Sequence, residues 1–350
     1  MRLLPKVLVD VSAVDTGAQI LGRPSALPIA VAPTGAAGFG WPGGDVAIAR
    51  AAAAVGIPYT LSTSATASIE RIAREAPGRL WFQAYILKQR SHTLRLIERA
   101  RDAGYEALMI TVDLPVGGLR ERDLRNDFAI PFRFTPKNVL DFAAHPRWAM
   151  RMLRAGMPVM ENLAGFTPQA TGAAGIASSV GRSYDPSFDW EGLRAIRDAW
   201  PGALIVKGIT RPDDAERAAS IGCQAIVVSN HGGRQLDGAV ATLDALPGVI
   251  ASAGHRIEVW LDGGIRRGSD IVKALALGAQ AVLIGRATLF GACAAGEPGA
   301  RRALDILREE LLRTMRLCGV RRVPEIGTAL LTRRSRGAPV LLPASAPAAD

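Results

Sequence analysis

The chain has 350 residues, of which 49% are hydrophobic, and its mean hydropathy is +0.16. This length suits either two average domains or one large α/β barrel, and the hydrophobic fraction is ample for a large core. No apolar run approaches the roughly 18–20 residues of a membrane span, because Gly, Pro, Arg or Asp interrupts the longest candidates. Residues 1–10 hold no apolar stretch that leads to a small-residue cleavage site, so we expect no signal peptide.

Charge and cysteine content narrow the setting. The 42 Lys and Arg residues exceed the 32 Asp and Glu residues, which gives a formal net charge of +10. An Arg-rich surface explains this excess, and the alternative is attraction to anionic substrates or an anionic membrane face. Aromatic residues make up only 5% and interleave with no basic run, which argues against nucleic acid as a partner. Cys223, Cys293 and Cys318 form no CxxC pair, so we expect a reduced, cytoplasmic protein.

Short β-branched runs recur along the chain, and each ends in Gly, Ser, Thr, Asn or Asp. Apolar runs without alternation are typical of parallel strands that are buried on both faces. The predicted strands are 28–34, 59–63, 80–86, 107–113, 204–209, 225–230, 258–264 and 281–287. The predicted helices between and after them are 45–55, 67–75, 91–103, 190–199, 212–221, 243–253, 270–277 and 300–317. This alternation predicts a (β/α)8 TIM barrel, with an open doubly wound sheet as the alternative.

One interval breaks the rhythm of the predicted barrel. About 90 residues separate the fourth strand from the fifth, and only 190–199 at their end resembles an ordinary barrel helix. We therefore predict a long insertion after strand four, which serves as a lid, a binding loop or a mobile segment. The rest of 1–337 forms one barrel domain, and the Ala/Pro-rich residues 338–350 are expected to be a disordered tail.

Polar residues gather where the predicted strands end, and in this fold the active site lies at the carboxyl ends of the strands. Any one of them could be a satisfied core group, but their number predicts a polar ligand site. These residues are Pro33, Thr34, Gly35, Ser62, Thr63, Gln83, Tyr85, Thr111, Asp113, Lys207, Ser229, Asn230, His231, Asp262, Gly263, Gly264, Gly285 and Arg286.

The last two strand ends predict a phosphate site. The sequence DGGIRRG (262–268) leads into a helix, and Gly285 and Arg286 follow the eighth strand. Glycine lets backbone N–H groups approach a phosphate, a helix N-terminus adds positive potential, and arginine is a forked donor. No GxGxxG follows the first strand, which argues against a Rossmann dinucleotide site.

The segment SNHGGRQLD (229–237) predicts acid–base chemistry. His231 is the one histidine of four that ends a predicted strand, and its glycine neighbours let a ligand approach the imidazole. Arg234 is placed to grip a carboxylate while His231 takes a proton, and Asp113 to bind the other ring nitrogen. The alternative is a glycine-rich turn with a structural histidine. No histidine spacing predicts a metal site.

These motifs resemble the FMN-dependent L-2-hydroxy acid dehydrogenases and oxidases, which include mandelate dehydrogenase, L-lactate dehydrogenase and glycolate oxidase. The likeness covers nearly the whole chain, and SNHGGRQLD is its most specific element. The other matching segments are PKVLVDVS (5–12), APTG (32–35), TLST (60–63), WFQAY (81–85), TVDLPVGGLRERD (111–123), VKGI (206–209) and LDGGIRRGSDIVKALALGA (261–279). The resemblance implies FMN as cofactor and oxidation of a 2-hydroxy acid to the 2-oxo acid. Alternatives are an FMN-barrel isomerase and a truncated FMN-binding barrel with little turnover.

The resemblance also implies roles for single residues. His231 is the base and Asp113 its partner, while Arg234, Tyr85 and Arg120 bind the substrate carboxylate. Lys207 lies by the N1–O2 edge of the flavin, where a positive charge favours the anionic reduced form. The residues implied to line the flavin ring and ribityl chain are Pro33, Thr34, Gly35, Ser62, Gln83, Thr111 and Ser229. Those implied to hold the ribityl and phosphate end are Asp262, Gly263, Gly264, Arg266, Gly285 and Arg286.

Departures from the family pattern refine the expected substrate. Ser64 stands where many short-chain oxidases carry tryptophan, which favours mandelate-like or lactate-like acids over glycolate. Gly35 stands where oxidases often carry alanine, which favours a dehydrogenase that passes electrons to an acceptor such as quinone over an oxygen-using oxidase. The family has an N-terminal helical segment that supplies another carboxylate-binding tyrosine. Because Met1 falls just before PKVLVDVS, we expect a more open site or an incomplete chain.

The insertion also resembles a membrane-attachment segment of this family. Residues 131–158 combine Phe, Trp and Met with Lys and Arg, which is compatible with peripheral contact at the inner face of the cell membrane. The alternative is a water-exposed active-site lid. The resemblance further implies a homo-oligomer, a tetramer.

Overall fold

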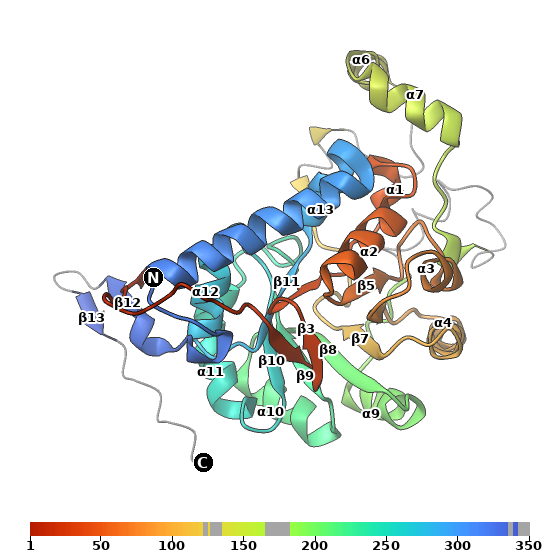
Figure 1. The fold of residues 1–350 in the computed structure, drawn as a ribbon. Coiled ribbons are helices and arrows are strands. Elements are labelled where there is room, and N and C mark those ends of the chain that lie inside the picture. The colour runs from red at the N-terminus through yellow and green to blue at the C-terminus, as the bar shows by residue number, and fades with distance from the viewer. Residues whose placement is uncertain (122–124, 127–134, 165–182, 335–338, 342–350) are drawn as a thin grey trace.

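A closed barrel of parallel strands forms the centre of the molecule (Figure 1). The computed structural model describes residues 1–121, 125–126, 135–164, 183–334 and 339–341. The strands are β4 (Ile29–Val31), β5 (Tyr59–Ser62), β6 (Leu80–Ala84), β7 (Ala107–Thr111), β8 (Ala203–Ile209), β9 (Ala225–Val228), β10 (Glu258–Leu261) and β11 (Ala281–Ile284). They pair in chain order, and β11 pairs with β4 to close the ring. All eight coincide with predicted strands, and the closure confirms the barrel over the open sheet.

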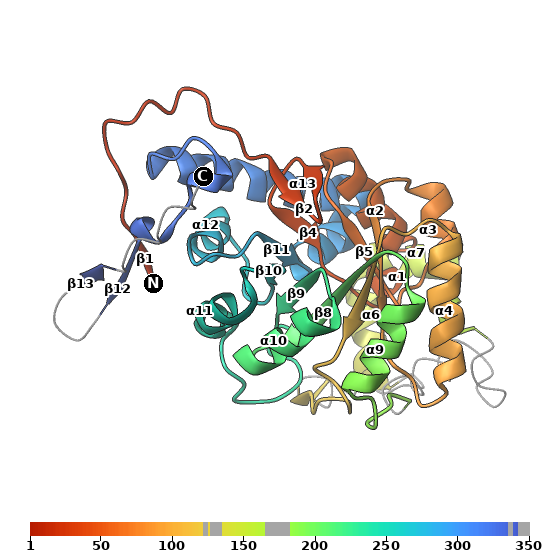
Figure 2. The same ribbon diagram turned by 90° about the horizontal axis from the view of Figure 1, so that it is seen from below.

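The predicted helices surround the barrel (Figure 2). They are α2 (Gly44–Val55), α3 (Ile69–Glu75), α4 (Arg90–Asp102), α9 (Trp190–Ala199), α10 (Pro212–Ile221), α11 (Thr242–Ala253), α12 (Gly268–Ala276) and α13 (Arg286–Leu317). The last helix begins earlier than predicted, and its backbone leaves the helical region at Ala295 and Gly296. Pro298 follows this kink and lacks a backbone N–H, so the sequence pattern places the start of the helix beyond it.

Further elements lie outside the predicted pattern. A short helix α1 (Ala37–Gly40) follows β4, and the hairpin of β2 (Ala18–Ile20) and β3 (Arg23–Ser25) precedes it. Near the chain ends, β1 (Arg2–Leu3), β12 (Leu331–Arg334) and β13 (Pro339–Leu341) form an antiparallel sheet away from the barrel (Figures 1 and 2). The 3-10 turns η2 (Val323–Glu325) and η3 (Thr328–Leu330) connect α13 to β12. Strand β13 falls within residues 338–350, which we expected to be a disordered tail. These three residues form a strand because their backbone pairs with β12. Residues 342–350 lie outside the described part of the chain.

The long insertion is more regular than a structureless loop. It contains α6 (Pro136–Ala144), α7 (Pro146–Ala155) and the 3-10 turn η1 (Glu161–Leu163). Proline occupies the first turn of both helices, where its missing N–H costs no hydrogen bond. Thr135 and Asn138 form a capping box at the start of α6. Helices α6 and α7 project beyond the barrel (Figure 1).

The barrel strands divide their side chains between two cores. One core lies inside the barrel, where Trp81 and Trp260 stack with ring centroids 5.1 Å apart. The other lies between the strands and the helices and includes Phe82, Leu108 and Val206. Successive strand residues face opposite sides of the sheet. Residues two positions after an inward-facing residue of the same strand therefore also face into the barrel. These residues are Ser62, Gln83, Thr111, Lys207, Ser229 and Asp262.

Candidate active site

His231 and Asp113 meet at the carboxyl ends of β9 and β7. The Nδ1 atom of His231 lies 2.9 Å from Asp113 Oδ1, and both side chains are largely buried. His231 has a φ of 57°, a left-handed conformation that non-glycine residues seldom adopt, and its backbone N–H donates to Ser229 Oγ at 3.0 Å. Gly208 has a φ of 112°, and a Cβ there would lie 2.7 Å from Asp113 Cβ. The backbone is thus shaped to bring this histidine and carboxylate together.

A buried lysine joins three neighbouring strands below the histidine. Lys207 Nζ lies 2.9 Å from Asp262 Oδ2 and donates a hydrogen bond to Ser229 Oγ at 2.8 Å. Lys207 is 4% exposed and Asp262 6% exposed, so the two charges are shielded from water. Buried charges require such partners. The hydroxyl of Ser229 accepts from both Lys207 and the His231 backbone, so the cation and the histidine share one support.

The basic and phenolic groups predicted for a substrate carboxylate share one neighbourhood. Burial raises the pKa of Tyr85 above its usual value; the Asp113 carboxylate adds to this, whereas Arg234 and Arg120 oppose it. Tyr85 follows Gln83 at the inward-facing spacing. The Arg120 Nη2 atom lies 3.5 Å from Oε1 of Gln235, next to the exposed Arg234. Two positive groups and a protonated phenol are therefore gathered near Asp113, the partner of His231.

Gly35 and Ser64 lie against each other in the loops that follow β4 and β5. A Cβ at Gly35 would lie 3.0 Å from Ser64 Cβ, and the next backbone N–H, that of Ala36, donates to Ser64 O at 2.9 Å. The Thr34 hydroxyl donates to Ala32 O at 3.3 Å, which turns this loop over the barrel end. The sequence marked Gly35 and Ser64 separately as determinants of substrate and acceptor. Their contact makes them one small-residue wall.

Sequence reasoning missed Tyr184, whose ring centroid lies 5.0 Å from that of Tyr85. It stands about 70 residues beyond β7, at the end of the insertion, where no strand or motif marks it. The isolated bridge between Leu87 and Tyr184 brings it to the barrel rim.

Comparisons with known proteins identify the family of this chain. A family profile described as FMN-dependent dehydrogenase matches residues 1–333. The chain belongs to this family. It is 46% identical over 318 residues to (S)-mandelate dehydrogenase of Pseudomonas putida, which covers 91% of this chain and 80% of that protein. It is 42% identical over 335 residues to L-lactate oxidase of Nostoc sp., which covers 95% of this chain and 86% of that protein.

A solved structure of the family matches the fold. The crystal structure of monotopic membrane protein (S)-mandelate dehydrogenase superposes with a TM-score of 0.90 at 43% identity, over 94% of this chain and 87% of that chain. Members of the FMN-dependent dehydrogenase family are oxidoreductases that use FMN, and this chain is one of them.

The residues at the barrel mouth fit FMN. Gln83 Nε2, Thr111 Oγ1 and Asp262 Oδ1 are buried and have no hydrogen-bond partner among the described residues. Buried polar atoms of a folded protein are normally paired, so a polar ligand is expected against them. At the phosphate end, Gly264 has a φ of 84° with nothing within 4 Å of a Cβ position. Gly285 begins α13 without a side-chain cap, which leaves N–H groups for an anion.

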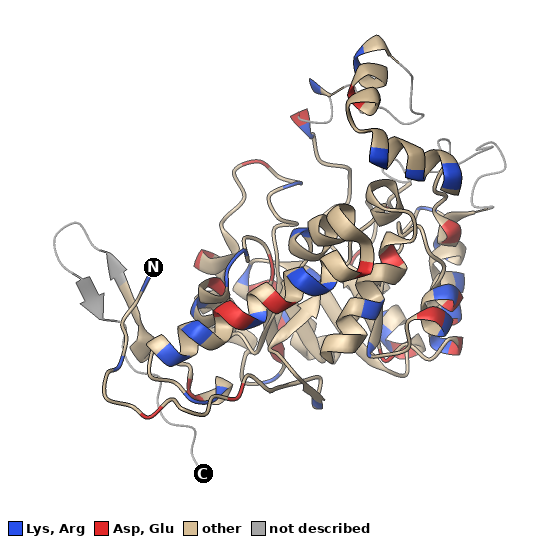
Figure 3. Ribbon diagram, turned by 45° about the horizontal axis from the view of Figure 1, so that its top comes forward, with Lys and Arg blue, Asp and Glu red and all other residues tan. Residues whose placement is uncertain are grey.

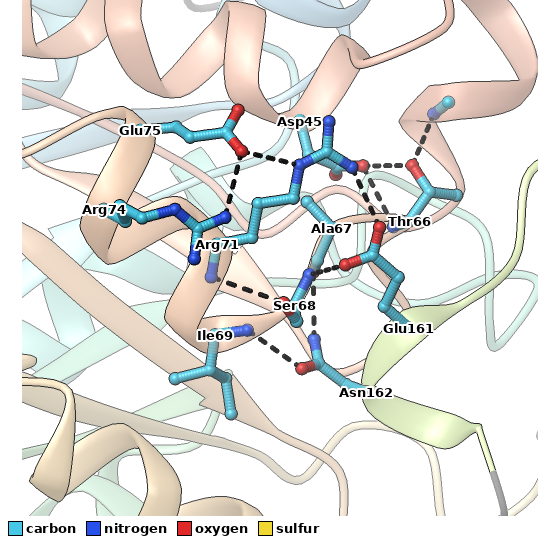
Figure 4. A network of polar contacts seen from close by, with 11 residues as sticks. Asp45, Thr66, Ala67, Ser68, Ile69, Arg71, Arg74, Glu75, Glu161 and Asn162 are labelled. Carbon is cyan, nitrogen blue, oxygen red and sulfur yellow. Dashed lines mark hydrogen bonds and ion pairs between the residues drawn. The ribbon is translucent and has the colours of Figure 1, made fainter. Parts of the chain in front are cut away.

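The end of the insertion is fastened to the segment that carries Ser64 (Figure 4). Glu161 Oε2 accepts from the Ser68 N–H at 2.8 Å, and Asn162 Oδ1 accepts from the Ile69 N–H at 3.0 Å. On the other side, the buried carboxylate of Asp45 accepts from the Thr66 backbone N–H at 2.9 Å and from its hydroxyl. Residues distant in sequence thus hold this loop from both sides.

No helix in the described part of the chain is long and apolar enough to cross a membrane.

Proposed function

We propose that this FMN-dependent dehydrogenase oxidises an L-2-hydroxy acid with a mandelate-like or lactate-like side chain, with His231 as the base. The contact of 2.9 Å between His231 Nδ1 and Asp113 carries this proposal. It leaves the other ring nitrogen, Nε2, for the proton of the substrate, because a carboxylate bound to Nδ1 fixes the tautomer. The general chemistry, FMN-dependent oxidation of a 2-hydroxy acid, follows from family membership.

The substrate carboxylate would be bound by Arg234, with Tyr85 and Arg120 beside it. Arginine binds carboxylates through two parallel hydrogen bonds, and the phenol donates one more. This grip would direct the carbon that bears the hydroxyl toward His231, which removes a proton. The negative charge of Asp113 would stabilise the imidazolium that forms. FMN, when bound, accepts the two electrons of the oxidation.

The cofactor contacts are part of the same proposal. Lys207 would supply positive charge to the flavin ring, since Asp262 and Ser229 fix its ammonium group inside the barrel mouth. The proposed FMN contacts are Pro33, Thr34, Gly35, Ser62, Gln83, Thr111, Lys207, Ser229, Asp262, Gly263, Gly264, Arg266, Gly285 and Arg286.

Gly35 and Ser64 support a substrate larger than glycolate. Their side chains together contain only one carbon and one hydroxyl, which favours a methyl or phenyl substituent beside them over an acid without one. Two relatives are named mandelate dehydrogenase and L-lactate oxidase, which is consistent with either a phenyl or a methyl substituent on the substrate.

The proposal includes peripheral membrane contact through 131–158, and helices α6 and α7 support it. The proposed electron acceptor is quinone. Leu140 and Leu153 are 71% and 78% exposed, and basic side chains occur on both helices (Figure 3). Two residues of α7 contact the barrel domain instead of being free to contact a membrane. Trp148 Nε1 donates to Phe39 O, and the Arg151 guanidinium lies over the Trp41 ring. Residues 131–134 lie outside the described range.

An oxygen-using oxidase is the second candidate, favoured by the identity to L-lactate oxidase. The decisive experiment mixes the yellow holoenzyme anaerobically with L-mandelate, L-lactate or glycolate and follows the visible flavin absorption. We expect bleaching by mandelate or lactate and slow recolouring in air. Rapid recolouring would identify an oxidase. Bleaching by none of the L-2-hydroxy acids would refute the proposed function.

The variant His231→Asn tests the base. We expect it to retain FMN and to lose bleaching, because asparagine cannot take up the proton. Bleaching at the wild-type rate would remove His231 from this role.

A further inference from the structure

Tyr184 is held at the rim of the barrel by backbone hydrogen bonds. The Lys88 N–H donates to Ser183 O at 2.8 Å, and the Asp185 N–H donates to Ile86 O at 2.9 Å. These two bonds flank the bridge between Leu87 and Tyr184, so the segment runs antiparallel to the chain that leaves β6. Asp185 also pairs with Arg90 at 2.8 Å. The backbone of Tyr184 is therefore fixed just beyond Tyr85.

The ring of Tyr184 lies against that of Tyr85 at the rim of the barrel. The two rings are tilted by 50° with centroids 5.0 Å apart, within the range of attractive aromatic pairs. Both side chains line one cavity of about 240 Å³, whose other walls include Val206 of β8 and Leu193 of α9 and do not include His231. Arg120 lies close enough to both phenols to oppose the rise that burial causes in the pKa of each.

The hydroxyl groups of these two tyrosines differ from that of Tyr105. The Tyr105 hydroxyl donates to Ile69 O at 3.0 Å, as a buried phenol normally does. Neither Tyr85 nor Tyr184 donates a hydroxyl hydrogen bond to any residue in the described ranges. Burial raises the pKa of Tyr184, so its phenol keeps its proton and stays a donor throughout the physiological pH range.

Two adjacent unpaired phenol donors beside arginine match the needs of one carboxylate, which accepts up to about four hydrogen bonds. We propose that Tyr184 is a second phenol that binds the carboxylate of the substrate, alongside Tyr85. This inference rests on the proposed function, because it takes a 2-hydroxy acid as the ligand. In this arrangement Arg234 and Arg120 neutralise the carboxylate, and the two phenols orient it. Tyr184 takes no part in proton transfer.

Equilibrium binding of the 2-oxo acid product tests the proposal without turnover. Pyruvate or phenylglyoxylate is titrated into the oxidised FMN-loaded enzyme, and the shift of the flavin absorption band gives Kd. Tyr184→Phe removes only the hydroxyl, and we expect Kd to rise about tenfold or more, since a hydrogen bond to a charged group is lost. The KM for the 2-hydroxy acid should rise in parallel, with kcat changed less.

The matched control is Tyr105→Phe, which removes a phenol that already has a partner in Ile69 O. We expect its Kd to stay within twofold of wild type, with some loss of thermal stability. A Kd within twofold of wild type for Tyr184→Phe would overturn the inference while leaving the proposed function intact. A wild-type flavin that no L-2-hydroxy acid bleaches would instead overturn the proposed function, and this inference with it.

Discussion

Replacing Asp113 by asparagine tests how much the carboxylate contributes to proton removal. The substitution keeps the shape of the side chain and a hydrogen-bonding atom near His231 Nδ1, but it removes the negative charge. The side chains are 10% and 16% exposed, so an effective dielectric constant near 20 is more suitable than that of water. At a charge separation of about 4 Å, the lost attraction to the imidazolium is about 4 kcal/mol. That corresponds to a slowing of roughly a thousandfold.

Anaerobic stopped-flow measurement of flavin bleaching at saturating L-mandelate or L-lactate isolates this step. We expect Asp113→Asn to retain FMN and to be reduced roughly a thousandfold more slowly than wild type. Glu106→Gln is the control, because Glu106 is also largely buried and paired but precedes β7 at the other end of the barrel. It should lower stability and leave bleaching unchanged. A rate for Asp113→Asn within tenfold of wild type would refute the electrostatic role of this carboxylate.

Two further predictions concern the loop between β5 and α3. Ser64→Trp should lower kcat/KM for L-mandelate by more than about tenfold relative to glycolate, since a bulky ring would fill the space beside Gly35; equal losses for both acids would contradict this. Burial raises the pKa of Asp45 from 3.8 to about 6, so the folded state loses about 3 kcal/mol of stability as the pH rises through this range. Urea unfolding of Asp45→Asn should therefore depend less on pH between 4 and 7 than wild type, and an unchanged slope would show that Asp45 does not titrate there.

The strands and their polar ends were predictable because each leaves a local signal. A run such as AIVV (225–228) is apolar throughout, since both faces of a barrel strand are buried, and SNH follows it directly. The barrel then brings together ends that are remote in sequence, as it does for Asp113 and His231. Fold and strand-end chemistry are therefore both encoded over short windows.

The remaining features depend on contacts that short windows do not contain. Tyr184 reaches the rim because its neighbours Ser183 and Asp185 form backbone hydrogen bonds with Lys88 and Ile86, and such bonds leave little signal in the sequence. The regular helices α6 and α7 of the insertion were missed because they stand outside the alternation of barrel strands and helices and bury no residue in the described structure. Strand β13 is positioned by antiparallel backbone pairing with β12, which the Ala/Pro-rich composition of 338–350 did not indicate.

The loop from Ser64 to Ile69 connects the insertion to the substrate site. Its backbone is bound by Ala36 at one end, by Asp45 in the middle and by the Glu161–Asn162 pair at the other end. Glu161 and Asn162 follow α7 after five residues, 156–160, so a displacement of the projecting helices would reach this loop through that connection and two hydrogen bonds. Asp45 opposes such a displacement. Moving Thr66 away would break its two hydrogen bonds to one Asp45 oxygen and leave that buried carboxylate without a partner, which is unfavourable. The wall beside Gly35 is therefore held by both the barrel and the insertion.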